Sequence, residues 1–228
     1  MDARQKADGH PSMNEYLTIV SITNGRSTHR HSLKALQDSE DVLCPIEVLQ
    51  DMPWTDALNQ CVDSCKTPLM LRVDDDMIVH PKAVAYMLHR SLQEKNFGLV
   101  YFHLWEDCTS RVRQSIKVYN VEALRHVGGF RSDPDTGRVD GRTNGALADD
   151  GYPIVEDASV TALHVCGTWD EQKRYEQLWG HRKPNRKAVK AYCGTKTVQQ
   201  QCDMRKEFLE DLNRKRQTPF AEFIRTFG

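Results

Sequence analysis

The chain has 228 residues, and its 31 Lys and Arg nearly balance its 32 Asp and Glu, which gives a formal net charge of −1 at pH 7. This length fits one domain with extensions or at most two small domains. A hydrophobic content of 39% excludes wholesale disorder, and the balanced charge argues against a general nucleic-acid binder. The longest apolar run, Ala83–Leu88, is too short for a transmembrane helix, which needs about 20 residues.

The N-terminal segment and the cysteines indicate the cellular compartment in which we expect the protein. Residues 1–14 are polar, which predicts a disordered leader without a signal peptide. The cysteines are odd in number and scattered, and none form a CxxC pair, which argues against a disulfide framework or a zinc ribbon. We therefore expect buried thiols and a reducing, cytoplasmic compartment. The seven are Cys44, Cys61, Cys65, Cys108, Cys166, Cys193 and Cys202.

In the first half of the chain, apolar runs rich in β-branched residues alternate with segments whose apolar residues recur every three or four positions. The first pattern predicts buried strands and the second amphipathic helices. Ser27 is placed to cap a helix, and Pro81 to open another. Strands are expected over Tyr16–Ile22, Cys44–Leu49, Thr67–Val73 and Phe97–Leu104, and helices from Ser27 to Leu36, over Asp56–Cys65 and from Pro81 to Leu92.

The second half is less regular. A turn-rich loop spans residues 132–137, and the segment from Lys173 to Lys190 carries seven Lys or Arg against one acid. A helix with Met204, Phe208 and Leu212 on one stripe is expected after Thr197. The other predicted elements are strands over Arg111–Tyr119 and Pro153–Val165, a short helix over Val121–His126 and a helix over Asp140–Asp150.

Strands that alternate with helices predict a mostly parallel α/β sheet that helices cover on both faces, in the Rossmann-like manner. Ligands of such sheets lie at the carboxyl ends of the strands. Thr23–Arg26 and Asp74–Asp76 both fall at such ends, so we expect them to share one site.

The triplet Asp74-Asp75-Asp76 is the strongest chemical signal in the sequence. Three consecutive carboxylates after an apolar strand repel one another and cannot be buried without compensation. A bound cation supplies that compensation, and hard oxygen ligands select Mg²⁺ or Mn²⁺. The alternative is a solvated turn that leads into the helix at Pro81.

Asp74–Pro81, a strand end with the triplet and then a proline that opens a helix, resembles the DxD segment of GT-A-fold glycosyltransferases, especially family 2. Other segments follow in the expected order. Thr18–Arg26 is similar to the first strand and nucleotide-contacting loop, Ala57–Val62 to the helix before the DxD strand, and Leu124–Phe130 to the segment that ends in Gly-Gly-Phe near the acceptor. The resemblance covers roughly residues 15–170.

The resemblance implies roles for several residues. In the family the first and third Asp of DxD hold the ribose and the metal on the donor diphosphate. Asp76 is then a metal ligand. Asp74 is a candidate both for the metal and for the nucleotide, and Asp75 is a candidate for the nucleotide. His164, at the end of a later strand, matches a histidine that several GT-A enzymes use as a further metal ligand. Its alternative is a structural histidine.

The nucleotide side also has candidates of its own. Thr23, Asn24 and Arg26 offer hydrogen bonds to a base and a ribose. Arg72 either balances the triplet or contacts the nucleotide. The basic segment from Lys173 to Lys190 is a candidate lid over the diphosphate or a solvated face. Trp169 and Trp179 are candidates for stacking on a sugar or for core packing.

The resemblance also implies a catalytic base that deprotonates the acceptor hydroxyl. Asp140 stands eleven residues before Gly151, which matches the separation in the family, although Val139 replaces the usual Glu. Asp157 is a second candidate for this role, and Asp149 and Asp150 are further rivals.

Together these features predict a metal-dependent glycosyltransferase that moves a sugar from a nucleotide-diphosphate donor, with UDP favoured over GDP, to an acceptor hydroxyl with inversion. The expected domains are a catalytic unit over 15–190 and a C-terminal helical extension over 191–228. Alternatives are a haloacid-dehalogenase-like phosphatase, whose motif normally follows the first strand, and a nucleotidyltransferase, whose glycine-rich loop is missing. A non-enzymatic alternative is a metal-dependent carbohydrate-binding module, typically all-β.

Overall fold

The computed structural model describes residues 15–23, 25–40, 44–50, 53–134, 139–168, 170–171, 186–195, 197–203 and 205–227. Its strands are β1 (Leu17–Thr23), β2 (Ile46–Gln50), β3 (Leu69–Asp74), β4 (Met77–Val79), β5 (Leu99–Glu106), β6 (Arg111–Asn120) and β7 (Ile154–His164). Its α-helices are α1 (His29–Gln37), α2 (Trp54–Ser64), α3 (Ala83–Leu92), α4 (Val121–His126), α5 (Asp140–Asp149), α7 (Arg186–Thr195), α8 (Val198–Asp203), α9 (Arg205–Arg216) and α10 (Pro219–Phe227).

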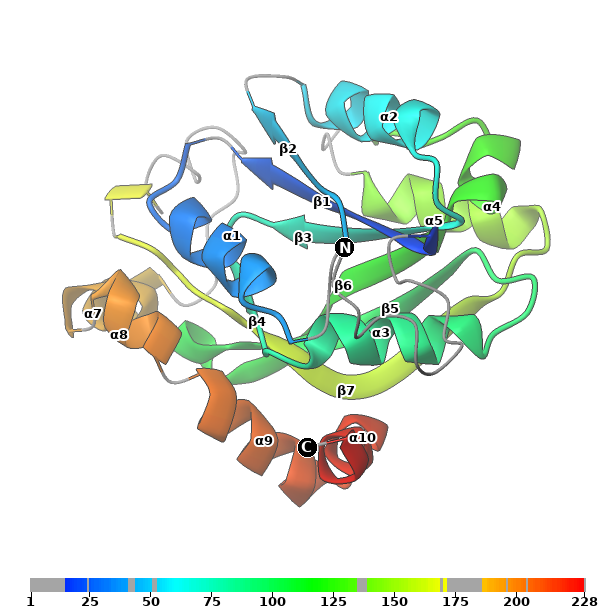
Figure 1. The fold of residues 1–228 in the computed structure, drawn as a ribbon. Helices are drawn as coiled ribbons and strands as arrows, with labels where there is room; N and C mark the ends of the chain where they lie inside the picture. Colours follow the sequence, from blue (N-terminus) through cyan, green and yellow to red (C-terminus); the bar gives the residue numbers. More distant parts are fainter. Residues whose placement is uncertain are drawn as a thin grey trace, which may run out of the picture.

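These elements confirm the predicted α/β fold, but the sheet is mixed rather than mostly parallel (Figure 1). Its order is β2-β1-β3-β6-β5-β7-β4. The pairs β1–β2, β1–β3 and β5–β7 are parallel, whereas β3–β6, β5–β6 and β4–β7 are antiparallel. The reason is local, because a single 3₁₀ turn, η3 (Asp107–Thr109), joins β5 to β6 and so short a connection makes a hairpin.

β4, which the sequence did not predict, requires the sheet to curl. Only Asp75 and Asp76 separate β3 from β4, yet β6, β5 and β7 lie between them in the sheet. In a flat sheet four strand spacings would cover about 19 Å, whereas three peptide steps reach about 11 Å. β3, inside the sheet, and the edge strand β4 must therefore approach each other at the triplet. Ser32 on α1 holds the two ends of the β3–β4 connection together, because its hydroxyl donates to the carbonyl oxygens of Asp74 and Met77 at 3.3 and 2.7 Å.

Alternation along the strands divides the core into two layers. Leu17, Ile19 and Leu71 pack with α1, α3, α9 and α10 on one face. Val20 and Met70, which point the other way, pack with α2, α4 and α5. Figure 1 shows these two groups of helices on opposite sides of the sheet, with α9 and α10 beside β7.

Of two local sequence signals, the structure explains the Gly-Gly-Phe segment and corrects the predicted Ser27 cap. Gly129, in the Gly-Gly-Phe segment, has a φ of +83°, and a Cβ there would lie 2.4 Å from Oδ1 of Asn59. That amide accepts from the Phe130 N–H at 2.6 Å, so glycine is required at this position. The predicted Ser27 cap is wrong, because Thr28 is the N-cap of α1 and the Ser27 hydroxyl donates to Glu171.

A disulfide joins Cys108 in η3 to Cys166 after β7, which corrects the expectation that the cysteines are all buried thiols. Disulfides persist in oxidising compartments, so the cysteines no longer support the expected cytoplasmic location. Cys61 and Cys65 do lie buried at α2, as expected of small hydrophobic residues. None of the described helices is long and apolar enough to cross a membrane.

The disulfide generates a stability prediction. It closes a loop with a sequence separation of 58, so replacing both cysteines with serine should lower the free energy of unfolding by roughly 2–4 kcal/mol. Denaturant titrations of the wild type and the double variant, with and without dithiothreitol, measure this. The reductant should lower the stability of the wild type alone. Equal stability of the oxidised wild type and the double variant would contradict the assignment.

A buried amide on α9 adds a polar link between the C-terminal helices and the sheet. The register of β5 with β7 shifts at His103, near Val160. Asn213 accepts from the Val160 N–H at 2.9 Å and donates to its carbonyl oxygen at 2.7 Å. Thr218, which precedes α10, donates its hydroxyl to the same amide oxygen at 2.7 Å.

Replacing Asn213 with alanine should therefore destabilise the protein. Two buried backbone groups of Val160 would lose their partners, at about 1–3 kcal/mol each, so we expect a loss of about 2–6 kcal/mol. Chemical denaturation measures it. Arg216→Ala on the exposed side of the same helix is the control and should change stability by less than about 0.5 kcal/mol. A similar small change for Asn213→Ala would show that water replaces the amide.

Candidate active site

The curled sheet brings four strand ends together at one edge. β1, β3, β5 and β7 all run in the same direction, because β6 is antiparallel to both β3 and β5. They end at Thr23, Asp74, Glu106 and His164 respectively. The site predicted at the carboxyl ends of the strands is therefore assembled here, with the triplet running across it.

Asp75 and Asp76 face the loop after β1. Thr23 donates its hydroxyl to Asp75 Oδ2 at 3.0 Å. The guanidinium Nη1 of Arg26 contacts Asp76 Oδ2 and lies 3.5 Å from Asp75 Oδ1. All three charged side chains are largely buried, with exposed fractions of 16% for Arg26, 8% for Asp75 and 10% for Asp76.

His164 meets the triplet from the other side. Its Nε2 lies 3.0 Å from Asp76 Oδ2, the oxygen that Arg26 also contacts. The β4–β7 pairing fixes this approach, because His164 is in register with Met77 and the Val165 N–H donates to the Asp76 carbonyl oxygen at 2.9 Å. The crossing of the chain between β3 and β4 therefore positions both side chains together.

Glu106, which the sequence analysis missed, stands behind His164. Its Oε1 lies 3.5 Å from His164 Nδ1, and its Oε2 accepts from Arg113 Nε at 2.9 Å. Burial alone would raise the pKa of this carboxyl, but His164, Thr109 and Arg113 outweigh it and lower the pKa well below the usual range. The predicted strand ended at Leu104, so Glu106 lay beyond it and carried no signal of burial.

A second charged cluster lies on the opposite side of the triplet. Arg72 Nε donates to Asp74 Oδ1 at 3.0 Å and its Nη1 to Asp140 Oδ1 at 2.8 Å. Lys117 Nζ lies 2.7 Å from the same oxygen of Asp140. Arg72 and Lys117 are neighbours because β3 and β6 pair them in register, and Trp54 covers the guanidinium with its ring centroid 5.1 Å from Cζ.

This cluster holds Asp140 as an anion. Burial would raise the pKa of its carboxyl, but the cations of Arg72 and Lys117 prevail and lower it to about 2. The side chain remains 47% exposed, so it is accessible to a solute. Lys117 was also missed in the sequence, although a lone lysine between buried Ile116 and Val118 signals an anionic partner.

The rival carboxylates lie elsewhere. Asp149 is the last residue of α5 and Asp150 its C-cap, at the end of the helix opposite to Asp140. Asp157 lies buried in the first half of β7, where Tyr86 donates to it at 2.6 Å and Arg90 Nε lies at 3.3 Å. The structure therefore brings Asp140, and not Asp157, next to the triplet.

Several nucleotide-side candidates cannot be placed. Asn24, Trp169, Trp179 and the part of the basic segment from 172 to 185 lie outside the described residues. Glu171, a described residue of this region, links it to the loop after β1. Glu171 accepts from the backbone N–H groups of Ser27 and Thr168 at 2.7 and 2.8 Å.

The donor set at Asp76 suits a divalent cation. A carboxylate oxygen and an imidazole nitrogen, as Asp76 and His164 present them, are ligands that Mn²⁺ accepts. Within the described part of the chain, no three His, Cys, Asp or Glu side chains form a group that could hold a metal. Among the described residues, Asp76 and His164 are the two that could act as ligands together, and Mg²⁺ usually takes further oxygens from the phosphates of its ligand.

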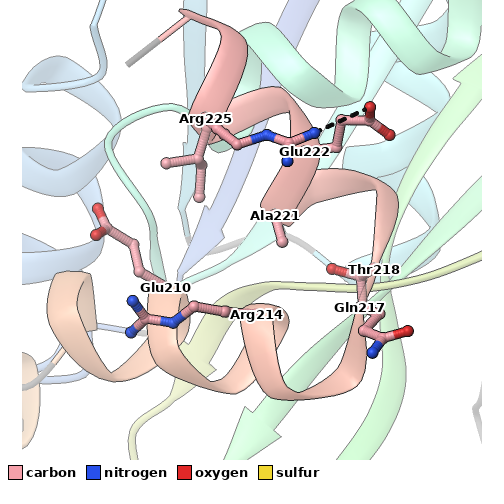
Figure 2. Close-up of a pocket in the computed structure, with 8 residues that line it drawn as sticks. Glu210, Arg214, Gln217, Thr218, Ala221, Glu222 and Arg225 are labelled. Carbon is pink, nitrogen blue, oxygen red and sulfur yellow. Dashed lines mark hydrogen bonds and ion pairs between the residues drawn. The ribbon is translucent and has the colours of Figure 1, made fainter.

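A pocket of 540 Å³ lies away from this edge, between α9 and α10 (Figure 2). Of the charged side chains that line it, Arg225 pairs with Glu222 at 3.4 Å, and Glu210 lies 3.2 Å from His80. Arg214 pairs at 3.1 Å with Asp211 of its own helix. The pocket contains none of the predicted site residues, so the candidate site remains the strand edge.

No protein-family model and no curated protein sequence matches the chain. Similarity appears among solved structures. The mannosyltransferase PcManGT of Pyrobaculum calidifontis, in complex with GDP-Man and Mn²⁺, superposes with a TM-score of 0.54 at 12% identity, over 78% of this chain and 68% of its own. A mutant of Drosophila beta-1,4-galactosyltransferase 7, with manganese, UDP-Gal and xylobiose, gives 0.52 at 9% identity, over 81% and 83%.

A nucleotidyltransferase also shares the fold. The CMP:2-keto-3-deoxy-manno-octonic acid synthetase, in complex with CTP, gives a TM-score of 0.50 at 11% identity, over 72% of this chain and 98% of its own. At such low identities the comparisons establish the fold, which is of the GT-A and Rossmann-like type. Function must be argued from the site.

The Asp140 cluster predicts a pH effect. Because the folded-state pKa is lowered to about 2, the pairing stabilises the fold above the unfolded-state value of about 3.9 and is lost as the pH falls toward 2. Lys117→Met should raise the pKa of Asp140, which carboxyl-carbon NMR titration measures directly. An unshifted Asp140 would show that Arg72 alone holds the anion.

Proposed function

We propose that this protein is a metal-dependent glycosyltransferase that moves a sugar from a nucleotide-diphosphate donor to an acceptor hydroxyl. The observation that carries the proposal is the meeting of Asp76, in the connection between β3 and β4, with His164, at the end of β7, at 3.0 Å. Its support is the fold, which the chain shares with nucleotide-sugar transferases that bind Mn²⁺.

On the donor side, Asp76 and His164 would hold Mn²⁺ or Mg²⁺. The bound cation would neutralise the nucleoside diphosphate that leaves as the sugar departs. Thr23 and Asp75, joined at 3.0 Å, lie beside the loop where a nucleoside would bind. Arg72 fixes Asp74 at 3.0 Å, so that this carboxylate is oriented before the donor arrives.

On the acceptor side, Asp140 is the candidate base. It is anionic at neutral pH, 47% exposed and joined through Arg72 to Asp74. A carboxylate that remains ionised is ready to accept the acceptor's proton in the transition state. The acceptor hydroxyl would attack the anomeric carbon directly and displace the nucleoside diphosphate. A single displacement of this kind inverts the configuration at that carbon.

A nucleotidyltransferase is the second candidate, because the CMP:2-keto-3-deoxy-manno-octonic acid synthetase shares the fold. Against it stands the loop after β1, where Thr23–Ser27 has one glycine. The products distinguish the two reactions, since a glycosyltransferase releases a nucleoside diphosphate and a nucleotidyltransferase releases pyrophosphate.

The test incubates the protein with Mn²⁺ and a panel of UDP- and GDP-sugars, with and without simple glycoside acceptors, and follows nucleoside diphosphate release. Asp140→Asn should retain donor binding but lower transfer by roughly 10²–10⁴-fold. Asp76→Asn should abolish Mn²⁺-dependent donor binding in a thermal-shift assay. Asp150→Asn, at the far end of α5, is the matched control and should behave as the wild type.

The outcomes separate the candidates. Release of UDP or GDP that depends on both Mn²⁺ and Asp76 supports the glycosyltransferase. Pyrophosphate release from a nucleoside triphosphate and a sugar phosphate or sugar acid would support the nucleotidyltransferase. Full transfer by Asp140→Asn would remove this residue from the base role.

A further inference from the structure

We propose that Arg26 is a built-in counter-ion that occupies the cation position at Asp76 until a nucleoside diphosphate draws it away. The protein would then bind divalent metal weakly alone and strongly together with the nucleotide. This inference rests on the proposed function, because it concerns the order in which metal and donor enter the same site.

The first argument is geometric. Asp76 Oδ2 is the oxygen that lies 3.0 Å from His164 Nε2, and the Arg26 guanidinium contacts that same oxygen. A cation that used both Asp76 and His164 as ligands would need the position beside Oδ2 that Arg26 occupies. Metal and guanidinium therefore compete for one carboxylate oxygen.

The second argument is electrostatic. Two positive charges at adjacent positions repel strongly where water is scarce, and the Arg26 and Asp76 side chains are only 16% and 10% exposed. Asp75, at 3.5 Å from Nη1, and Asp76 together favour the charged guanidinium against the opposing effect of burial. In the donor-free protein Arg26 thus neutralises part of the negative charge on these two largely buried carboxylates.

The third argument concerns the place to which Arg26 moves. It belongs to the short connection between β1 and α1 and directly follows Gly25, which has a φ of +74° and, apart from its chain neighbours, no atom of the described residues within 4 Å of where a Cβ would lie. A diphosphate is a strong bidentate partner for a guanidinium. A donor bound beside this loop would therefore give Arg26 a new anion and leave Asp76 to the metal.

Linkage gives the exchange a measurable consequence. If the nucleotide removes a competitor of the metal, it must tighten metal binding, and the metal must tighten nucleotide binding by the same factor. A coupling of this kind is typically 5- to 150-fold. Without the guanidinium, most of that coupling should disappear.

The experiment titrates Mn²⁺ by electron paramagnetic resonance, with and without UDP or GDP, in four proteins. They are the wild type, Arg26→Gln, Arg26→Lys and the control Arg30→Gln. Arg30 is exposed on α1, four residues away, so its variant removes the same charge without touching the triplet. Circular dichroism verifies folding.

We expect Arg26→Gln to bind Mn²⁺ about tenfold more tightly than the wild type when no nucleotide is present. Its coupling between Mn²⁺ and the nucleotide should be correspondingly weaker. Arg26→Lys, which keeps the charge, and Arg30→Gln should stay close to the wild type in nucleotide-free Mn²⁺ affinity. Unchanged or weaker Mn²⁺ binding by folded Arg26→Gln would overturn the inference.

A second measurement covers the case in which Arg26→Gln does not fold. In the wild type, the side-chain Nε–H signal of Arg26 should shift when Mg²⁺ and UDP or GDP are added together, and hardly move with Mg²⁺ alone. A signal that stays unchanged with both ligands bound would overturn the exchange. Absence of any Mn²⁺–nucleotide binding in the wild type would instead count against the proposed function itself.

Discussion

The two-residue connection between β3 and β4 is the constraint on which the site depends. Because the chain must pass from the middle of the sheet to its far edge within Asp75 and Asp76, the sheet cannot stay flat. The curl that results carries the end of β7, and with it His164, onto the triplet. The same short connection therefore shapes the fold and gathers the groups on which the proposed chemistry depends.

Charge compensation is the price of gathering so many carboxylates in one place. Two clusters provide it, because Arg26 pairs with Asp75 and Asp76 while Arg72 pairs with Asp74 and Asp140. Under the proposed function, the first cluster would hold the metal and the diphosphate, and the second would keep Asp140 ionised for the acceptor hydroxyl. The donor and the acceptor would then lie on the two sides of a single strand end.

Elements on the β7 side stabilise this arrangement. The Cys108–Cys166 disulfide joins the chain just beyond Glu106 to the chain just beyond His164, which are the ends of β5 and β7. The amide of Asn213 holds α9 on β7 where the β5–β7 register shifts. The strand that delivers His164 is thus fixed at its end and along its length.

The sequence by itself determined the alternating elements and the strand-end position of the triplet, because burial patterns and turn residues are local. It also indicated Arg26 and Arg72 as charged residues near that end, whereas Asp140 was indicated only by the family resemblance. Only the tertiary structure decided the mixed pairing, the curl and the contacts of Asp76 with His164 and Arg26. Those contacts join residues 50 and 88 positions apart, and the disulfide joins residues 58 apart, so nothing in their local spacing could specify them.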